Sequence, residues 1–471
     1  MQELLITHGA LVTVDPADTV LEDGALLVRG QRIADLGPTA DLLPRYPGAE
    51  VIDASGMAVL PGLVNTHSHM AATMARSVAD DVPPKTWAAL VWSITDHFDE
   101  EKIYWAALLA ATEMIASGTT TVNDHHPYAA AVAQAVDKAG LRADLADTVA
   151  ERLGHSQGAA SLRRAVEFAR QWHGRADGRI RARLGPHALY TCSTELLLAT
   201  RDAARELGVG MHMHVAETAQ EIELVGPGRA GATSAQHLHA LGLLTRDFVI
   251  AHGLTLNAED VRLVAEAGAS IAHCPQTYGK MGITFPNVEA WQAAGIPVGL
   301  GTDGPGSTND LDLFEEMRFA SLARKLLAQS ATALPAPRAL RMATLDGART
   351  LGLASETGSL EVGKKADVIL VDFHRPHLTP FHNVVGQLVY SAKAGDVDTV
   401  VIDGRVVYRQ RRHLTLDVDE VIDRAQQTFL ELAQKAGWSV SVQLPVESQA
   451  RALARMQNQP AVQAIRGLKD L

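Results

Sequence analysis

The sequence predicts an α/β protein in which a (β/α)8 TIM-like barrel is inserted into a small β-sandwich formed by both termini. Two observations predict it. Eight short apolar segments alternate with amphipathic segments through the middle of the chain, and β-rich stretches lie at both ends. Alternating strands and helices form a parallel sheet, and eight such units close into a barrel whose functional residues lie at the C-terminal strand ends.

The β-rich ends of the chain indicate two halves of one small domain. Candidate strands in the first half cover 4–6, 10–14, 24–28 and 32–36, with Asp-Pro, Glu-Asp-Gly, Arg-Gly and Gly-Pro turn signals among them. The second half carries strands over 365–372 and 397–408, with a tight Asp403-Gly404 turn. Each half is too short for a core of its own, so one shared sandwich is favoured over two independent β appendages.

The middle of the chain supplies the candidate barrel. Its eight apolar segments are 64–65, 120–122, 143–145, 182–184, 211–213, 249–251, 270–272 and 298–300. Helical patterns lie between most of them, among them 105–117, 162–173 and 258–267, with glycine near their C-terminal ends. The alternative is an open doubly wound sheet, but no Gly-x-Gly-x-x-Gly motif follows an early strand.

The predicted domain division follows from these segments. The halves of the sandwich are residues 1–56 and 358–413, the barrel is residues 57–357, and C-terminal helices occupy 414–471. Two amphipathic patterns in the last region, 418–436 and 450–468, predict helices that serve packing or oligomerisation.

Composition and charge exclude several classes of partner. The 471 residues are 47% hydrophobic and 20% charged, with a net charge of −12 and no basic stripe, so we expect no nucleic acid. No uncharged apolar run reaches the length of a membrane span and the first residues lack signal-peptide features, so we expect no membrane partner. The only cysteines, Cys192 and Cys274, are far apart, which excludes a disulfide framework and favours a cytoplasmic location.

The stretch from Leu60 to Met70 joins an apolar run to two histidines. Because strand side chains alternate, His67 and His69 point to one side and Ser68 to the other. Two imidazoles at a rigid strand end form half of a metal site, although alone they also fit ordinary surface histidines.

Other predicted strand ends supply the second half. The fifth strand carries His212, His214 and Glu217, the sixth carries His252, and the eighth carries Asp303. Taken singly, Glu217 fits a helix dipole, Asp303 a turn and His252 a core position. Their joint placement favours a site, since imidazoles with one carboxylate suit a borderline metal.

These motifs resemble the amidohydrolase superfamily, in its branch of chlorohydrolases and aminohydrolases. The similar segments are 61–69 (Pro-Gly-Leu-Val-Asn-Thr-His-Ser-His), 185–188 (Gly-Pro-His-Ala), 214–218 (His-Val-Ala-Glu-Thr), 272–275 (Ala-His-Cys-Pro) and 301–304 (Gly-Thr-Asp-Gly). The resemblance covers nearly the whole chain, because the split β-sandwich is also a feature of this family.

The resemblance implies that His67, His69, His214 and Asp303 bind one divalent metal, most often Zn²⁺. His214 rather than His212 matches the metal position, because it stands three residues before Glu217. The fourth strand ends without the lysine that dinuclear members carboxylate, so one metal ion is expected. His212 is expected to lie deeper in the barrel in a structural role.

The resemblance also implies hydrolytic deamination of an amino-substituted N-heterocycle. Zinc lowers the pKa of a bound water to about 7. Asp303 is expected to accept a proton from that water, and Glu217 to protonate the ring nitrogen and help expel ammonia. His252 is expected to orient the water and support the tetrahedral intermediate.

The substrate is argued from residues around the expected metal. His187 matches a position that contacts substrate in adenosine-type deaminases, and Trp87 resembles their aromatic lid; Glu217 is also expected to contact the substrate. Asp96 stands near the place of the family's ribose-binding acid, in Trp-Ser-Ile-Thr-Asp where Trp-Pro-x-Glu is usual. Loops 146–152 and 275–282 also depart from the family pattern.

The preferred small-molecule substrate is therefore an adenosine-type nucleoside: S-adenosylhomocysteine, methylthioadenosine or adenosine. The alternatives are an s-triazine or a free base such as guanine or 8-oxoguanine. A catalytically silent barrel acting as a scaffold is disfavoured, because every expected ligand and the acid are present. The resemblance also implies a homo-oligomer, either a dimer or a tetramer.

Overall fold

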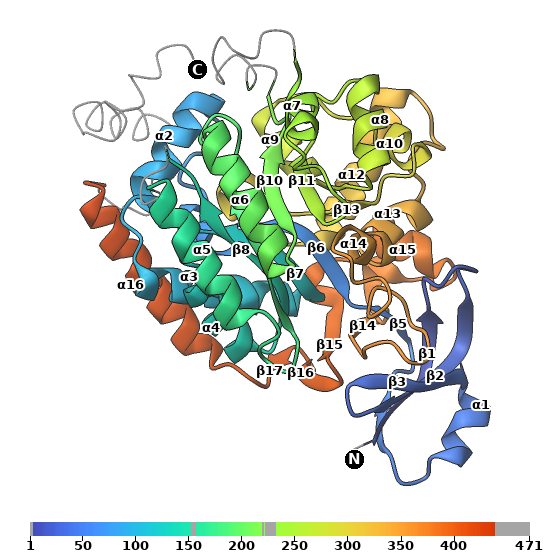
Figure 1. Ribbon diagram of the computed structural model, residues 1–471. Helices are drawn as coiled ribbons and strands as arrows, with labels where there is room; N and C mark the ends of the chain where they lie inside the picture. The colour runs from blue at the N-terminus through green and yellow to red at the C-terminus, as the bar shows by residue number, and fades with distance from the viewer. Residues whose placement is uncertain (1–2, 152–156, 219–220, 222–231, 439–471) are drawn as a thin grey trace.

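The computed structural model describes residues 3–151, 157–218, 221 and 232–438, so the helix predicted over 450–468 lies outside the described residues. Figure 1 shows a bundle of strands surrounded by helices, with a second sheet beside it that contains the N-terminal strands. No helix in the described part of the chain is long and apolar enough to cross a bilayer.

The larger unit is the predicted barrel. Its strands pair in parallel and in chain order, each with the next: β6 (Leu63–Ser68), β7 (Thr119–His126), β8 (Arg142–Val149), β9 (Ile180–Pro186), β10 (Met211–Val215), β11 (Phe248–His252), β12 (Ser270–His273) and β13 (Val298–Leu300). Nearly all their residues are buried, as in sheets covered by helices. Each of the eight predicted segments lies within one of these strands, so the barrel prediction is confirmed.

Contacts between the first and last strands close the ring. Asn65 donates from its amide to Thr302 Oγ1 at 2.7 Å, and the backbone NH of Asp303 donates to the carbonyl of His67 at 3.0 Å. Gly301 makes this approach possible, because a Cβ there would lie 2.8 Å from the backbone nitrogen of His67. The closure brings the residues that follow β13 against the end of β6.

Helices cover the outside of the barrel and its C-terminal rim. They are α2 (Pro84–Thr95), α3 (Glu100–Ala116), α4 (Ala129–Ala139), α5 (Ala159–Trp172), α6 (Thr194–Leu207), α7 (Ser234–Ala240), α8 (Ala258–Ala267), α9 (Pro275–Met281), α10 (Val288–Ala293), α11 (Pro305–Thr308), α12 (Leu313–Ala328), α13 (Ala336–Met342) and α14 (Leu345–Thr350). The glycines expected near the ends of the helices predicted over 105–117, 162–173 and 258–267 are Gly118, Gly174 and Gly268, and all three have positive φ. A short 3-10 helix, Met70–Ala75, follows β6.

The two termini contribute to one shared β unit, as predicted, and their strands form a single sheet. Its strands are β1 (Glu3–Val12), β2 (Val20–Arg29), β3 (Arg32–Pro38), β4 (Glu50–Asp53), β5 (Met57–Pro61), β14 (Val368–Asp372), β15 (Val397–Ile402), β16 (Arg405–Arg409) and β17 (Arg412–His413). The halves join where β14 pairs antiparallel with β5. The helix α1 (Thr39–Leu42) packs against β2 and β3. The division into domains at 56/57, 357/358 and 413/414 stays a prediction.

One detail of this sheet corrects the sequence interpretation. Segments 4–6 and 10–14 were predicted as separate strands, but β1 runs through both as one strand, up to Val12. Its pairing with β2 shifts register on either side of Gly9, where a Cβ would lie 2.4 Å from Val59 Cγ2. The glycine therefore marks an irregularity within a strand rather than a turn. The predicted Asp403-Gly404 turn is confirmed, with both residues at positive φ between β15 and β16.

Two helices and one group of ion pairs connect the terminal sheet to the barrel. The helix α15 (Val384–Tyr390) packs on α13, and α16 (Val418–Lys435) packs along α3. Figure 1 shows α16, drawn in red, running down the side of the barrel. At the base of the barrel, Arg142 donates to both carboxylate oxygens of Asp367, at 2.7 and 3.0 Å, and to Asp403 at 3.1 Å.

Candidate metal centre and active site

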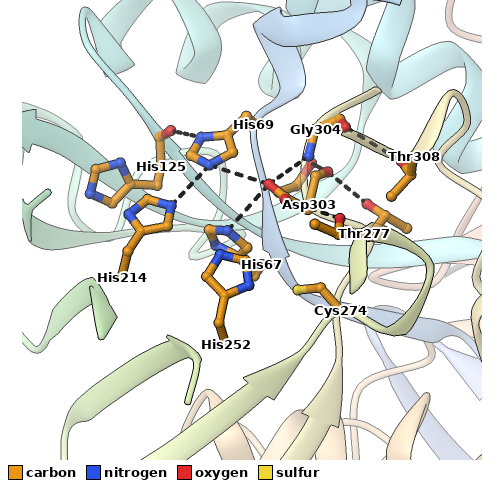
Figure 2. Close-up of polar contacts among 12 residues, drawn as sticks. His67, His69, His125, His214, His252, Cys274, Thr277, Asp303, Gly304 and Thr308 are labelled. Atoms are coloured by element: carbon orange, nitrogen blue, oxygen red, sulfur yellow. Dashed lines mark hydrogen bonds and ion pairs between the residues drawn. The ribbon is translucent and has the colours of Figure 1, made fainter. Parts of the chain in front are cut away.

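Three strand ends bring the predicted metal residues together. In Figure 2, dashed lines join His67 and His69 to one carboxylate oxygen of Asp303, and a third joins His69 to His214. That oxygen, Oδ1, lies 3.5 Å from the Nε2 atoms of both His67 and His69, and the Nε2 atoms of His69 and His214 are 3.1 Å apart. His252 also belongs to the cluster, because one ring nitrogen each of His67, His214 and His252 lie within 4.8 Å of one another.

The hydrogen bonds made by the outer nitrogens (Nδ1) of His69 and His214 show that the inner nitrogens (Nε2) of these rings can bind a cation. His69 donates from Nδ1 to the carbonyl of His125 at 2.5 Å, and His214 donates from Nδ1 to the carbonyl of His187 at 2.9 Å. A carbonyl oxygen only accepts, so the proton of each neutral ring is on Nδ1 and the lone pair is on Nε2. Two lone pairs that face each other at 3.1 Å repel, and a cation bound by both removes that repulsion.

Burial keeps these imidazoles in the form that binds metal. The side chain of His67 is fully buried, and this lowers its pKa to about 3. Burial also lowers the pKa of His214 well below the ordinary histidine value. Neutral imidazole is the metal-binding form, and Nε2 of His67 has no hydrogen-bond partner among the described residues.

Asp303 supplies the negative charge of the cluster. Asp303 is buried, and its Oδ1 faces Nε2 of His67 and of His69, each at 3.5 Å. No lysine or arginine pairs with Asp303 in the described ranges. Three nitrogen ligands and one buried carboxylate without a basic partner match the donor set of a zinc site.

The backbone NH of Gly304 and the hydroxyl of Thr277 orient the Asp303 carboxylate. Oδ1 accepts the backbone NH of Gly304 at 2.8 Å, and Oδ2 accepts the hydroxyl of Thr277, on α9, at 3.1 Å. Asp303 itself has a φ of +57°, which is unusual for a residue with a Cβ and occurs often at functional sites. Thr277 was not singled out from the sequence, because its contact depends on the fold of α9.

Glu217 lies just beyond β10, beside His252. Its Oε1 is 3.9 Å from Nε2 of His252, and its side chain is 32% exposed while that of His252 is buried. Backbone bonds tie the two loops together, since Gly253 donates to the carbonyl of Val215 at 3.0 Å. The predicted acid therefore lies at the edge of the cluster, where a bound substrate can reach it.

A second carboxyl on the same loop, Glu221, was missed by sequence reasoning. It is buried, and Oε2 accepts the backbone NH of Glu217 at 3.0 Å. Burial, and then the charge of Glu217, raise the pKa of Glu221 to about 8, so this carboxyl is neutral at pH 7. The pair Glu217-x-x-x-Glu221 was visible in the sequence, but only burial distinguishes the second acid from a surface residue.

The predicted substrate residues lie at different distances from the cluster. His187 is close, with its ring centroid 4.8 Å from that of His214 and Nδ1 3.1 Å from Thr191 Oγ1. Trp87, on α2, donates from its indole nitrogen at 2.8 Å to the carbonyl of Gly306, on α11 just after Asp303. Asp96 is the C-terminal cap of α2 and is half-buried. Substrate contact by these three residues stays a prediction.

Two further residues support the site without having been predicted. His125 lies at the end of β7; its carbonyl fixes His69, and its ring is 5.2 Å from that of His214. The signal was present, because the run Asn-Asp-His-His directly continues the second predicted strand. Tyr278, in the loop that departs from the family pattern, is fully buried, accepts the backbone NH of Cys274 at 2.9 Å and packs near His252. Cys192 and Cys274 are both buried and free.

A TIM-type barrel that gathers a His-x-His pair, two more histidines and an aspartate at its C-terminal end defines a class of hydrolase, the amidohydrolases. The chain belongs to the amidohydrolase family, whose profile matches residues 58–407. A bacterial imidazolonepropionase-like composite domain matches residues 24–49. The family assignment made from the sequence motifs is therefore confirmed.

Within the family, the chain is similar to enzymes that carry nucleoside deaminase names. It is 41% identical to the 5-methylthioadenosine/S-adenosylhomocysteine deaminase of Pelotomaculum thermopropionicum over 92% of this chain and 100% of that protein. It is 38% identical to the 5'-deoxyadenosine deaminase of Methanosarcina mazei, over 92% and 99% of the two chains. Among solved structures, an adenosine deaminase from Xanthomonas campestris with bound zinc superposes with a TM-score of 0.87 at 34% identity, over 92% and 99% of the chains.

Proposed function

We propose that this protein hydrolytically deaminates an adenosine-type nucleoside such as S-adenosylhomocysteine, methylthioadenosine or adenosine. Water replaces the exocyclic amino group of the purine, which leaves the inosine-type product and ammonia. The observation that carries the proposal is the pair of imidazoles, His69 and His214, whose tautomers direct two Nε2 lone pairs at one point beside the Asp303 carboxylate. The names and high coverage of the relatives support the nucleoside as the substrate class.

We infer a single Zn²⁺ held by His67, His69, His214 and Asp303. The two groups of candidate ligands in the described residues share His67, which supports one centre rather than two. The end of β9 carries Gly185, Pro186 and then His187, with no lysine to bridge a second ion. When bound, zinc polarises a water molecule so that it can act as a nucleophile near neutral pH.

The protein side chains perform the proton transfers. Asp303 directs Oδ1 toward the cluster while Thr277 and Gly304 fix the carboxylate, so Asp303 receives the proton that the attacking water loses. Glu217 gives its proton to the purine ring nitrogen next to the amino-bearing carbon. The proton held by Asp303 then passes to the departing amino group, while Glu217 takes back a proton from the hydroxyl of the tetrahedral intermediate and so helps to expel ammonia. His252 donates to the developing oxyanion from Nε2, which lies 3.9 Å from Glu217.

The neighbouring loops bind and enclose the nucleoside in this proposal. His187 and Glu217 contact the purine, Trp87 covers it, and Asp96 serves the ribose hydroxyls. The hydrogen bond from Trp87 to the carbonyl of Gly306 supports this arrangement, because it fixes α2 against α11, which begins two residues after Asp303. A dimer or tetramer is part of the proposal and is tested by sedimentation analysis of the purified protein.

The test is ammonia release from purified protein with measured zinc content. The panel contains S-adenosylhomocysteine, methylthioadenosine, adenosine and 5'-deoxyadenosine, with guanine, 8-oxoguanine and an aminotriazine as the alternatives. We expect turnover of the nucleosides, loss of activity after chelation and recovery with zinc. Turnover confined to a free base or a triazine would refute the nucleoside assignment while leaving the metal chemistry in place.

A further inference from the structure

The outer nitrogens of the three candidate histidine ligands have different kinds of partner. Those of His69 and His214 donate to backbone carbonyls, at 2.5 and 2.9 Å. The outer nitrogen of His67, Nδ1, instead lies 3.0 Å from Nε2 of a fourth imidazole, His212. The rings of His67 and His212 meet edge to face, with an interplanar angle of 86°.

This difference matters because an imidazole, unlike a carbonyl, can either donate or accept. If His212 accepts, the proton of His67 is on Nδ1 and its Nε2 lone pair faces Asp303 and the cluster. If His212 donates, the proton of His67 is on Nε2, and that nitrogen cannot bind a metal. The tautomer of His212 therefore decides whether His67 can be a ligand.

Among the described residues, the contact with His67 is the hydrogen bond available to the ring of His212. Both rings are fully buried, so water does not reach the pair. Nδ1 of His212 has no hydrogen-bond partner among the described residues, and Nε2 faces His67. From the sequence we expect a structural role for His212, deeper in the barrel. The burial agrees with that expectation, but the contact is with a candidate metal ligand.

We propose that His212 is a positioning residue for the metal centre: its Nε2 accepts from Nδ1 of His67 and so directs the Nε2 lone pair of His67 toward the zinc. The proposal rests on the zinc site of the proposed function and adds to it a residue that touches neither metal nor substrate. Residues that orient metal-bound histidines contribute to metal affinity about 10–100-fold. The affinity of this centre for zinc should therefore depend on an acceptor at position 212.

Two substitutions at position 212 distinguish the effect of the hydrogen-bond acceptor from the effect of side-chain volume. His212→Phe fills the space of the ring without an acceptor, whereas His212→Gln places its amide oxygen about where Nε2 lies. The matched control is His273→Phe, which removes another fully buried imidazole, at the end of β12, with neither ring nitrogen hydrogen-bonded among the described residues. Zinc dissociation constants come from chelator competition, and thermal unfolding of the metal-free proteins reports stability separately.

We expect His212→Phe to weaken zinc binding by about 10–100-fold, and His212→Gln to restore most of that loss. His273→Phe should leave the zinc affinity unchanged, whatever its effect on stability. Equal zinc affinity in wild type and His212→Phe, with only the metal-free stability lowered, would overturn the positioning role. If the wild-type protein itself binds no zinc, the metal site of the proposed function fails as well, so the two failures are distinguishable.

A second measurement needs no variant. In zinc-loaded wild-type protein with ¹⁵N-labelled histidine, the imidazole nitrogen shifts report the tautomers directly. A His212 ring with the proton on Nδ1 and a bare Nε2 supports the proposal. A His212 ring with the proton on Nε2 overturns it.

Discussion

Replacing Glu217 by glutamine tests the proton transfer on which the proposed reaction depends. Glutamine keeps the volume and the hydrogen-bonding oxygen of the side chain but has no carboxyl proton to transfer. Positioned acid–base groups contribute about 10²–10⁴-fold, or roughly 2.7–5.4 kcal/mol of the activation free energy. Glu217 is 32% exposed, so water partly replaces the lost acid and we expect a fall in kcat of about 10²–10³-fold.

The assay is ammonia release from S-adenosylhomocysteine or adenosine at pH 7, with zinc content measured on the same preparation. Zinc content should not change, because the contact of the Glu217 carboxylate is with His252 Nε2 at 3.9 Å and not with Asp303. The control is Glu151→Gln, at the end of another barrel strand, where the carboxylate bonds Ser193 instead. Full activity in Glu217→Gln would refute the acid role, and loss of zinc would show that Glu217 belongs to the metal site.

Three more predictions concern the Asp303 carboxylate, the titration of Glu221, and the ion pairs of Arg142 between the barrel and the terminal sheet. Asp303→Asn removes the carboxylate from the cluster, so zinc affinity should fall by more than about 100-fold while the metal-free protein still unfolds cooperatively; unchanged affinity in chelator competition would contradict this ligand assignment. The pKa of Glu221 is raised by burial from 4.5 to about 8, so its contribution to stability is full below pH 4.5 and is lost as pH rises through about 8. In urea titrations Glu221→Gln should therefore match wild type near pH 4.5 and be more stable by about a few kcal/mol at pH 9, and parallel curves would contradict the burial argument. Arg142→Met leaves the buried carboxylates of Asp367 and Asp403 without their guanidinium and should lower the free energy of unfolding by about 3–5 kcal/mol, partly recovered by adding Asp367→Asn; an unchanged urea midpoint would contradict it.

The departures from the family pattern acquire a physical meaning in the structure. The loop over 275–282, whose sequence argued against a nucleoside pocket, folds as α9 and contributes Thr277 to the Asp303 carboxylate. Its Tyr278 ring fills buried space near His252 and His273. The 275–282 loop therefore packs against the candidate metal centre, through Thr277 on Asp303 and Tyr278 near His252.

The sequence by itself determined the barrel and the members of the cluster. Strand periodicity is local, so short apolar segments separated by amphipathic helices predict eight parallel strands without knowledge of any contact. The alternation of a strand is also local, and it placed His67 and His69 on one side before the barrel was known. The candidate site residues were recognisable because they lie at or just beyond the ends of predicted strands.

Only the tertiary structure decided which groups support that cluster. The bond of His67 to His212, the carbonyl of His125 under His69 and the hydroxyl of Thr277 on Asp303 join residues that are 145, 56 and 26 positions apart. Burial likewise separates Glu221 from the surface acids and sets its pKa, and no local pattern encodes it. Hydrogen-bond partners and desolvation depend on which groups surround a residue in three dimensions. The sequence therefore predicted the members of the cluster but not the atoms that hold them in place.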